Sequence, residues 1–299
     1  MTDKTLLVDI KRNALDDGPG IRTLLFFKGC PLSCVWCQNP EAKSPFKEIS
    51  FNKDSCSECG TCLKVCNQDA IDFSNKYRID RSLCNLCGKC IEVCPNYALE
   101  FVGQEYSIKE LLEIILKDKI FYKNSGGGVT FSGGEPLYHI DYINELVKEL
   151  KKEDIHVCLE TSGYYNRDKF YEFILPYIDL IYFDLKIYNP KLHARYCKVS
   201  NESILENFED IIKNKSIEIL PRIPLIPNIT DTDENLSNLA NYLKTFKIKK
   251  IGLLPYNPLW LSKPEKIGIK PSYDYTAWLD NKDKERIKSI FSDFEFNDL

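Results

Sequence analysis

The chain of 299 residues is poor in methionine and histidine, with one and three residues, and has no large excess of either charge. Its 40 basic and 44 acidic side chains give a net charge of −4, which does not indicate a nucleic-acid-binding surface. No apolar run reaches the roughly 18 residues that a membrane-spanning helix needs. The opening MTDKTLLVDI lacks the charges and the apolar length of a signal peptide. We therefore expect a cytoplasmic protein with no nucleic-acid or membrane partner.

Cysteine, by contrast, is abundant, with 13 residues in a chain that we expect in a reducing compartment. Disulfides are rare in such a compartment, so spaced cysteines there indicate metal binding. Eleven of them fall into three groups, and two groups share the spacing C-x2-C-x2-C-x3-C at an offset of 28 residues. Neighbouring residues repeat as well, since CLKVCNQDAIDF at 62–73 parallels CIEVCPNYALEF at 90–101. This segment is therefore an internal duplication.

The duplicated spacing is that of bacterial ferredoxins, in which the fourth cysteine of each motif binds the cluster of the other motif. We therefore expect one 4Fe–4S cluster on Cys56, Cys59, Cys62 and Cys94, and another on Cys66, Cys84, Cys87 and Cys90. Zinc is the alternative, but it favours two C-x2-C pairs about 15–20 residues apart. Residues 51–101 are expected to form this ferredoxin-like domain, inserted into a larger domain of residues 1–50 and 102–299.

The third group, Cys30, Cys34 and Cys37, has the spacing C-x3-C-x2-C and follows an apolar, strand-like run at 21–27. A cubane held by three thiolates leaves one iron without a protein ligand, and such an open position is where chemistry occurs. Taken alone, this triplet is also compatible with a structural or zinc site. All eleven cysteines together predict three 4Fe–4S clusters, about twelve iron atoms per chain, and an anaerobic habitat.

From residue 102 onward the pattern alternates between helix and strand, which predicts a parallel α/β sheet. In addition to 21–27, strands are expected at 129–131, 155–159, 180–183, 217–220 and 251–254, and helices at 107–121, 140–151, 167–175, 204–214, 235–246 and 280–291. Ser107 and Glu110 are spaced as a capping box, and residues 231–233 as a helix cap. Functional groups of parallel barrels follow the strands, and one rim is predicted to hold Cys30, Gly133, Glu160 and Asp184.

Four motifs in order resemble those of the radical S-adenosylmethionine superfamily, in the form found in activating enzymes of glycyl radical enzymes. FFKGCPLSCVWCQNPE at 26–41 resembles the cluster loop, and GGGVTFSGGEPL at 126–137 resembles the GGEP motif. DDGPGIRT at 16–23 resembles a further segment, and a ferredoxin-like insertion is typical of one subset of these enzymes. The resemblance spans about residues 8–260 and implies fold class α/β with a partial, TIM-like (β/α)6 barrel.

The resemblance implies a reaction in which one electron reaches the three-cysteine cluster and S-adenosylmethionine is cleaved to methionine and a 5′-deoxyadenosyl radical. That radical takes a hydrogen atom from a backbone glycine of a partner glycyl radical enzyme. Flavodoxin or ferredoxin is implied as electron donor, and the insertion either relays electrons or shapes the docking surface. Partner candidates are 4-hydroxyphenylacetate decarboxylase, glycerol dehydratase, choline lyase and formate-lyase-like enzymes. A radical enzyme acting on another peptide or a small molecule is the alternative.

The resemblance also implies the residues that bind S-adenosylmethionine, with the amino group near Gly134. The implied contacts are Trp36, Cys37, Gln38, Gly133, Gly134, Glu160, Asp184, Leu185 and Lys186. The pair of acids is also an implied site for a monovalent cation, although Glu160 stands where pyruvate formate-lyase activase often has aspartate. That activase places a histidine after the fifth strand, but PNITDTDENLS at 227–237 contains none. Arg222 is expected either at the mouth of the barrel or as a strand-edge charge.

Overall fold

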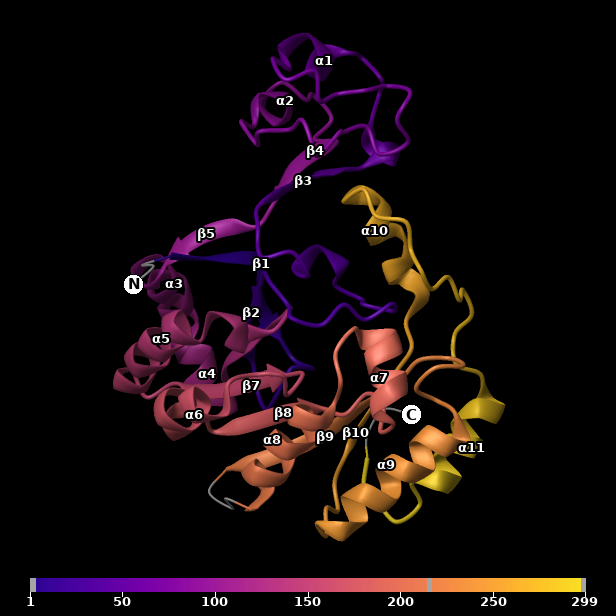
Figure 1. The fold of residues 1–299 in the computed structure, drawn as a ribbon. Coiled ribbons are helices and arrows are strands. Elements are labelled where there is room, and N and C mark those ends of the chain that lie inside the picture. Colours follow the sequence, from indigo (N-terminus) through magenta and orange to yellow (C-terminus); the bar gives the residue numbers. More distant parts are fainter. Residues whose placement is uncertain (1–3, 214–216, 297–299) are drawn as a thin grey trace.

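The computed structural model describes residues 4–213 and 217–296, which form a large sheet, a small sheet and surrounding helices (Figure 1). The large sheet has eight strands in the order β10-β9-β8-β7-β6-β2-β1-β5. Six of them run parallel: β2 (Arg22–Phe27), β6 (Gly128–Gly133), β7 (His156–Thr161), β8 (Leu180–Asp184), β9 (Glu218–Leu225) and β10 (Gly252–Pro255). All six predicted strands are therefore confirmed, and so is the mostly parallel α/β fold.

Two antiparallel strands extend the sheet on the far side of β2 and were not predicted. β1 (Lys4–Ala14) pairs with β2, and β5 (Gln104–Ser107) pairs with β1. The four residues of β5, QEYS, are polar and too few to show a period. This strand forms because β1 offers a free edge, which is a contact distant in sequence.

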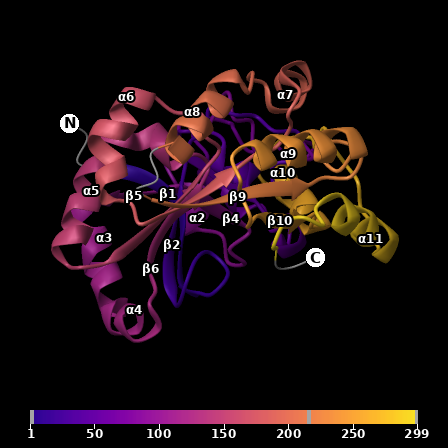
Figure 2. The same cartoon turned by 90° about the horizontal axis from the view of Figure 1, so that it is seen from below.

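The helices outside residues 48–102 alternate with or follow the strands of this sheet, and Figure 2 shows several of them in an arc around it. They are α3 (Ile108–Ile115), α4 (Lys119–Ser125), α5 (Ile140–Lys152), α6 (Arg167–Lys169), α7 (Pro190–Cys197), α8 (Glu202–Lys213), α9 (Asp233–Thr245), α10 (Lys263–Lys266) and α11 (Asn281–Ile290). The Ser107–Glu110 capping box is confirmed, and Thr232 caps α9. Residue 214, the predicted end of α8, lies outside the described residues.

Two predicted helices are interrupted, each for a structural reason. Residues 107–121 form α3 and α4 with a 3-10 turn at Leu116–Asp118 between them. The Asp118 carboxylate at this break accepts hydrogen bonds from Arg12 Nε (2.7 Å) and Thr23 Oγ1 (2.9 Å). Residues 167–175 begin as α6 but continue as a π-helical turn, Phe170–Ile174, ahead of Pro176, which has no N–H for a helical bond.

The main hydrophobic core fills the space between the large sheet and its helices. Every parallel strand contributes to it, and these side chains are at most 1% exposed: Phe27, Phe131, Leu159, Phe183, Leu225 and Leu253. A second core, around Trp36, Tyr256 and Trp260, packs beneath the loop that follows β2. Close packing in the two cores fixes the strands, and it thereby fixes the positions of the loops that begin at their carboxyl ends.

Residues 48–102, here called the small unit, stand apart from the large sheet at the top of Figure 1. β3 (Glu48–Phe51) and β4 (Leu99–Val102) pair antiparallel and form its base, and its two helices are α1 (Thr61–Val65) and α2 (Lys89–Glu92). Its own small core includes Ile49, Phe51, Ile71, Ile79 and Leu99. The predicted boundaries at 51 and 101 fall within the two base strands.

Polar contacts join the small unit to the rest of the chain. Lys28, which follows β2, is fully buried, and its ammonium lies 2.6 Å from a Glu48 carboxylate oxygen. Farther along, Lys76 pairs with Glu265 of α10 at 2.5 Å. The Lys28 pair is the stronger constraint, because removing one partner would leave a buried charge uncompensated.

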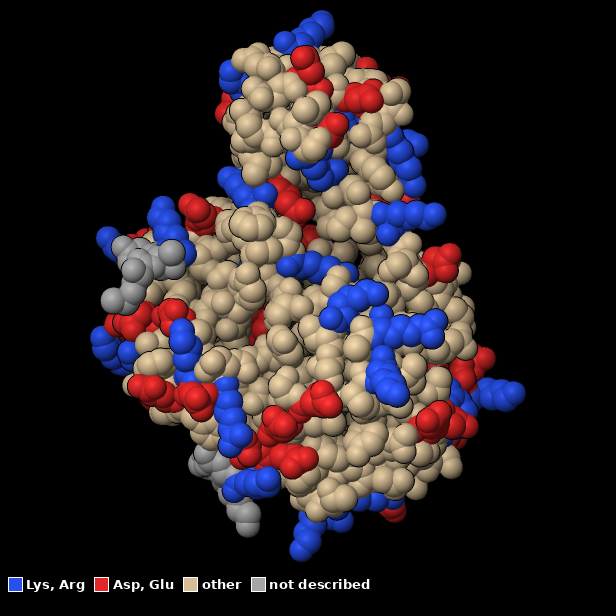
Figure 3. Space-filling view, in the orientation of Figure 1, with Lys and Arg blue, Asp and Glu red and all other residues tan. Residues whose placement is uncertain are grey.

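Figure 3 shows both acidic and basic side chains on the face in view, with several basic ones gathered right of the centre and several acidic ones below it. Among the helices of residues 4–213 and 217–296, none is both long and apolar enough to span a bilayer.

Candidate active site

A cavity of about 710 Å³ opens at the carboxyl ends of the parallel strands, where the sequence predicted a functional rim. Its volume is within the range of small-molecule and cofactor sites. The predicted residues that line it are Cys30, Cys34, Trp36, Cys37, Gln38, Gly133, Gly134, Glu160, Asp184 and Lys186. Leu185 lies elsewhere, since its side chain belongs to the main core and its N–H donates to the Arg222 carbonyl at 2.8 Å.

The loop that carries Cys30, Cys34 and Cys37 is held mainly by its backbone. The N–H of Cys30 donates to the Lys43 carbonyl at 3.0 Å, and the Lys43 ammonium donates to the Cys34 carbonyl at 2.9 Å. On the other side, the N–H of Val35 donates to the Tyr196 carbonyl of α7 at 3.0 Å. Because these bonds use backbone atoms of the loop, they leave the three thiols available as ligands.

The environment of the three thiols is mostly apolar. Burial raises the pKa of Cys30 and raises the pKa of Cys37 to about 11. The pKa of Cys34 is lowered by a hydrogen bond with the thiol of Cys197, helped by Lys186. Thiolates in such a site need a compensating positive charge, which bound metal provides.

The Gly133–Gly134 pair brings the end of β6 directly against this loop. Gly133 has a φ of +104°, and a Cβ there would lie 2.5 Å from both the N and the O of Phe27. A Cβ on Gly134 would collide with the carbonyl oxygens of Gly29 and Ala42. The N–H of Gly134 donates to the Phe27 carbonyl at 2.8 Å. Both glycines are therefore required for the close approach of β6 to the backbone of this loop.

Glu135, the next residue, is fully buried and links two strand ends, a role that the sequence analysis did not predict. Its carboxylate accepts from Thr161 Oγ1 (2.9 Å), from the N–H of Ser162 (2.7 Å) and from Ser162 Oγ (2.6 Å). Burial raises the pKa of Glu135, although these donors favour its ionised form. This carboxylate fixes the end of β7 against the turn after β6. The only hint in the sequence was that Glu135 is the glutamate of the GGEP motif. No local pattern indicates that its partners are Thr161 and Ser162, which lie 26 and 27 residues away.

Three charged side chains from neighbouring strands, together with Lys186 just after β8, form a network on the cavity wall. Arg222 of β9 donates from NH1 to Glu160 of β7 at 2.6 Å and from Nε to Asp184 of β8 at 2.9 Å. The Lys186 ammonium donates to the other Asp184 oxygen at 3.0 Å. Ser132 Oγ donates to the second Glu160 oxygen. Arg222 therefore lies at the rim, in the first of its two expected places.

These contacts keep the network charged despite its burial. Burial opposes the charges of Lys186 and Arg222, but Asp184 outweighs it and raises the pKa of both. The carboxylate of Asp184 is half-buried, and Arg222 and Lys186 lower its pKa. The Lys186 ammonium and the Arg222 guanidinium therefore stay positively charged in the cavity wall, where they can bind the carboxylate of a ligand.

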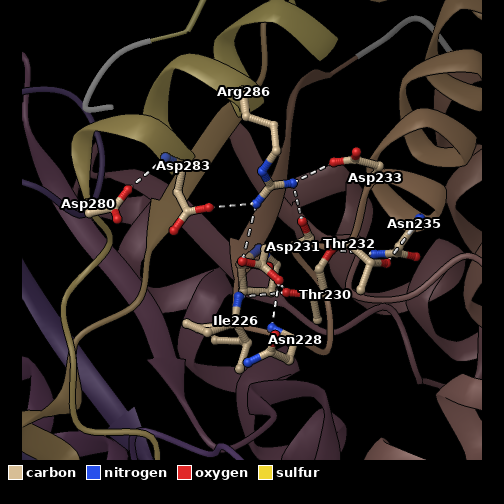
Figure 4. Close-up of polar contacts among 12 residues, drawn as sticks. Ile226, Asn228, Thr230, Asp231, Thr232, Asp233, Asn235, Asp280, Asp283 and Arg286 are labelled. Carbon is tan, nitrogen blue, oxygen red and sulfur yellow. Dashed lines mark hydrogen bonds and ion pairs between the residues drawn. The ribbon is translucent and has the colours of Figure 1, made fainter.

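The loop after β9, which lacks a histidine, is shaped by polar cross-links (Figure 4). The N–H of Asn228 donates to the Asp231 carboxylate at 2.7 Å, and Arg286 of α11 donates to the Asp231 carbonyl at 2.8 Å. Asn235 Nδ2 donates to the carbonyl of Lys186 at 3.1 Å. The loop is therefore tied to α11, and α9, which follows the loop, is tied through Asn235 to the segment that carries Lys186.

The small unit contains two further pockets, each lined by four of its cysteines. The first pocket is lined by Cys56, Cys59, Cys62 and Cys94, together with Phe73, Arg78 and other residues. The second is lined by Cys66, Cys84, Cys87 and Cys90, with Ile49, Ile71 and Ile79 among its other residues. In residues 4–213 and 217–296, no three His, Cys, Asp or Glu side chains are close enough to hold a single metal ion. The grouping by pocket is the crossed grouping predicted from the spacing.

Comparison with known proteins gives the class of this fold and site. Residues 90–240 match the radical SAM superfamily, in which SAM is S-adenosylmethionine, and residues 77–100 match the 4Fe–4S binding domain. A radical SAM methyltransferase from Sphaerobacter thermophilus has a similar fold, with a TM-score of 0.54 at 12% identity over 98% of this chain and 76% of that one. The chain is a radical SAM protein.

Relatives that match nearly the whole chain give its place within this superfamily. The trans-4-hydroxy-L-proline dehydratase activating enzyme of Clostridioides difficile is 38% identical over 98% of this chain and 97% of its own length. The 4-hydroxyphenylacetate decarboxylase activating enzyme of Clostridium scatologenes is 35% identical over 98% and 96%. The chain therefore belongs to the activating enzymes of glycyl radical enzymes. It is an oxidoreductase that activates its partner through cleavage of S-adenosylmethionine.

Proposed function

We propose that the cavity at the strand ends is where this chain binds S-adenosylmethionine beside a 4Fe–4S cluster held by Cys30, Cys34 and Cys37. The observation that carries this proposal is that the three cysteines, the glycine pair and the Asp184–Lys186 pair line one cavity. Three soft thiolate donors suit an iron–sulfur cluster, and their loop provides no fourth cysteine. The six parallel strands in sequence order support the expected partial (β/α)6 barrel.

The chain's own residues have distinct tasks in this site. Lys186 attracts the carboxylate of S-adenosylmethionine, and Asp184 holds the ammonium of Lys186 in place at 3.0 Å. Gly133 and Gly134 let the end of β6 lie directly against the cysteine loop, because a Cβ at either position would collide with backbone atoms of that loop or of Phe27. The bound cluster and S-adenosylmethionine supply the reductive bond cleavage and the abstraction of a hydrogen atom from the partner's glycine. Trp36 and Leu32 contribute apolar wall that excludes water.

The network of Arg222 argues against the monovalent cation that the resemblance implied. The guanidinium of Arg222 already lies between Glu160 and Asp184, within 2.6 and 2.9 Å of their oxygens. The remaining oxygen of each acid accepts from Ser132 or from Lys186. These acids therefore do not fit a metal cation, and we assign the neutralising role to Arg222.

We further propose that residues 51–101 are a ferredoxin-like domain with two 4Fe–4S clusters, which brings the total to three. The two four-cysteine pockets support this assignment, and so does the match of residues 77–100 to the 4Fe–4S binding domain. We assign the electron donor as a low-potential one-electron carrier, flavodoxin or ferredoxin.

The crossed ligand sets predict which substitutions are equivalent. Cys94→Ala should remove the same cluster as Cys56→Ala, because both side chains line the first pocket, and Cys66→Ala should instead match Cys84→Ala. Iron and sulfide are expected to fall from about twelve to about eight per chain in every case. EPR spectra of the reduced variants provide the comparison. Identical spectra for Cys94→Ala and Cys84→Ala would contradict the crossed assignment.

The proposed activity is tested with candidate partner enzymes. Relatives that activate enzymes for different substrates are 34–39% identical to this chain, so a panel of partners is needed. The reduced protein and S-adenosylmethionine are mixed with each partner, and a glycine-centred EPR doublet is expected with one of them. A partner whose glycine is replaced by alanine is the control. S-adenosylmethionine cleavage coupled to a small-molecule product, with no doublet in any mixture, would favour the alternative class of radical enzyme.

A further inference from the structure

The two cysteine pockets of the small unit differ in one charged side chain, Arg78. This residue lines the first pocket, and it is only 5% exposed. The second pocket is lined largely by apolar side chains, and its cationic lining residue, Lys89, is exposed to solvent. A buried charge acts more strongly on its surroundings than an exposed one, because water screens it less. The two pockets are therefore electrostatically unequal despite the duplicated sequence.

The guanidinium of Arg78 has donors that the described part of the chain does not use. Its NH2 group donates to Glu58 at 3.2 Å, whereas its Nε and NH1 atoms are buried and have no partner among the described residues. The side chain of Glu58 is 69% exposed, so its compensating charge is largely screened. One face of the guanidinium covers the ring of Phe73 at 3.7 Å. Because buried charged donors rarely remain unpaired, these two atoms indicate a partner that is not part of the chain.

The backbone at Arg78 adds an independent reason to regard this side chain as selected for its chemistry. Its φ is +63°, in the left-handed region that arginine adopts at a cost and that asparagine or glycine adopts more readily. The turn itself is closed by backbone bonds, since the N–H of Arg78 donates to the Asn75 carbonyl at 2.9 Å. A residue with a short side chain would therefore suit the fold at least as well.

We propose that Arg78 donates hydrogen bonds to the cluster on Cys56, Cys59, Cys62 and Cys94 and raises its reduction potential above that of the second cluster. The inference rests on the proposed function, which places a cluster in each pocket. Reduction adds one electron to a cluster, and a nearby cation with N–H groups on sulfur stabilises the added negative charge. Because the first cluster then has the higher reduction potential, an electron delivered to the small unit resides mainly on that cluster rather than on the second.

Arg81 is the other arginine near these cysteines, and its position differs. It lines a separate cavity with Cys84, and its NH2 group donates to the carbonyls of Ile49 (3.1 Å) and Lys266 (3.3 Å). Arg81 therefore joins the small unit to the end of α10. It does not line either four-cysteine pocket.

The proposal is tested by redox titration of the full-length reconstituted protein, followed by EPR. Arg78→Asn removes the charge and suits the left-handed turn, Arg78→Lys keeps the charge without the planar donors, and Lys89→Asn is the matched control at the second pocket. In Arg78→Asn, one of three one-electron steps should move to lower potential. At a fixed potential, the reduced-to-oxidised ratio of that cluster should fall about tenfold, the size expected for one lost charged hydrogen bond. Arg78→Lys should show a smaller shift, and Lys89→Asn none.

Iron content separates the possible outcomes. Arg78→Asn with about twelve irons and all three steps at the parent potentials would overturn the proposal. If Arg78→Asn loses four irons per chain, its potential cannot be compared with that of the parent. The proposal then requires that Arg78→Lys keeps the first cluster and that the reduction potential of this cluster is lowered. Loss of the cluster in both variants would make Arg78 a structural residue of the cysteine loop and would also overturn it. A parent protein with only about four irons would instead contradict the proposed clusters of the small unit.

Discussion

Replacing Cys34 by alanine is expected to abolish reductive cleavage of S-adenosylmethionine and to lower the iron content from about twelve to about eight per chain. The side chain of Cys34 is 8% exposed and lines the cavity, and loss of one of three thiolates leaves too few ligands for the cluster. The loop itself should keep its shape, because its bonds to Lys43 and Tyr196 use backbone carbonyls and N–H groups of the loop. Production of 5′-deoxyadenosine by the reduced protein is the measurement.

Cys158→Ala is the matched control for this substitution. Cys158 lies fully buried in β7 and outside the three cysteine groups, and burial raises its pKa to about 12, so its thiol stays protonated. Its removal should cost on the order of 1 kcal/mol of stability and leave iron content and cleavage unchanged. Continued formation of 5′-deoxyadenosine by Cys34→Ala would refute the assignment of the catalytic cluster.

Replacing Gly134 by alanine is expected to lower the rate of cleavage by about 100-fold, as for a misplacement of roughly 1 Å in a site. The new methyl group would collide with the carbonyl oxygens of Gly29 and Ala42, which belong to the backbone of the cysteine loop. The loop must shift away from β6, which also costs about 1–3 kcal/mol of stability. Initial rates of 5′-deoxyadenosine formation and thermal unfolding measure the two effects.

A second glycine substitution tests whether the effect of Gly134→Ala is specific to the rim. Gly126, at the end of α4, has a φ of +70° and open space around the position of a Cβ. Asparagine tolerates this backbone conformation, so Gly126→Asn should keep the parent rate. Equal rates for Gly134→Ala and the parent would mean that the loop moves without consequence for the site.

Sequence reasoning predicted the parallel strands because each is an apolar run and because, from residue 102 onward, such runs alternate with helical stretches. It failed where partners distant in sequence decide the structure. β5 depends on the edge of β1, and the break at Leu116–Asp118 coincides with the bonds from Arg12 and Thr23. Such contacts carry no local period.

The candidate site divides in the same way. The eight cysteines of the small unit were predicted from their duplicated spacing, whereas the roles of the three-cysteine loop and of the Gly133–Gly134 pair were predicted from the family resemblance of their motifs. The roles of Arg222 and Glu135 required the register between strands, since Arg222 pairs with Asp184 across β9 and β8. No feature of the sequence near Arg222 selects between the rim and the strand edge.

The base of the small unit decides how this unit is connected to the rest of the chain. Glu48 and Val102 face each other across β3 and β4, so the chain enters and leaves the unit at neighbouring points. A segment with adjoining ends is equivalent, for the rest of the fold, to a longer surface loop. The small unit is therefore an insertion in the topological sense: the order of the eight sheet strands does not depend on it, and the buried Lys28–Glu48 pair is what its removal would disrupt.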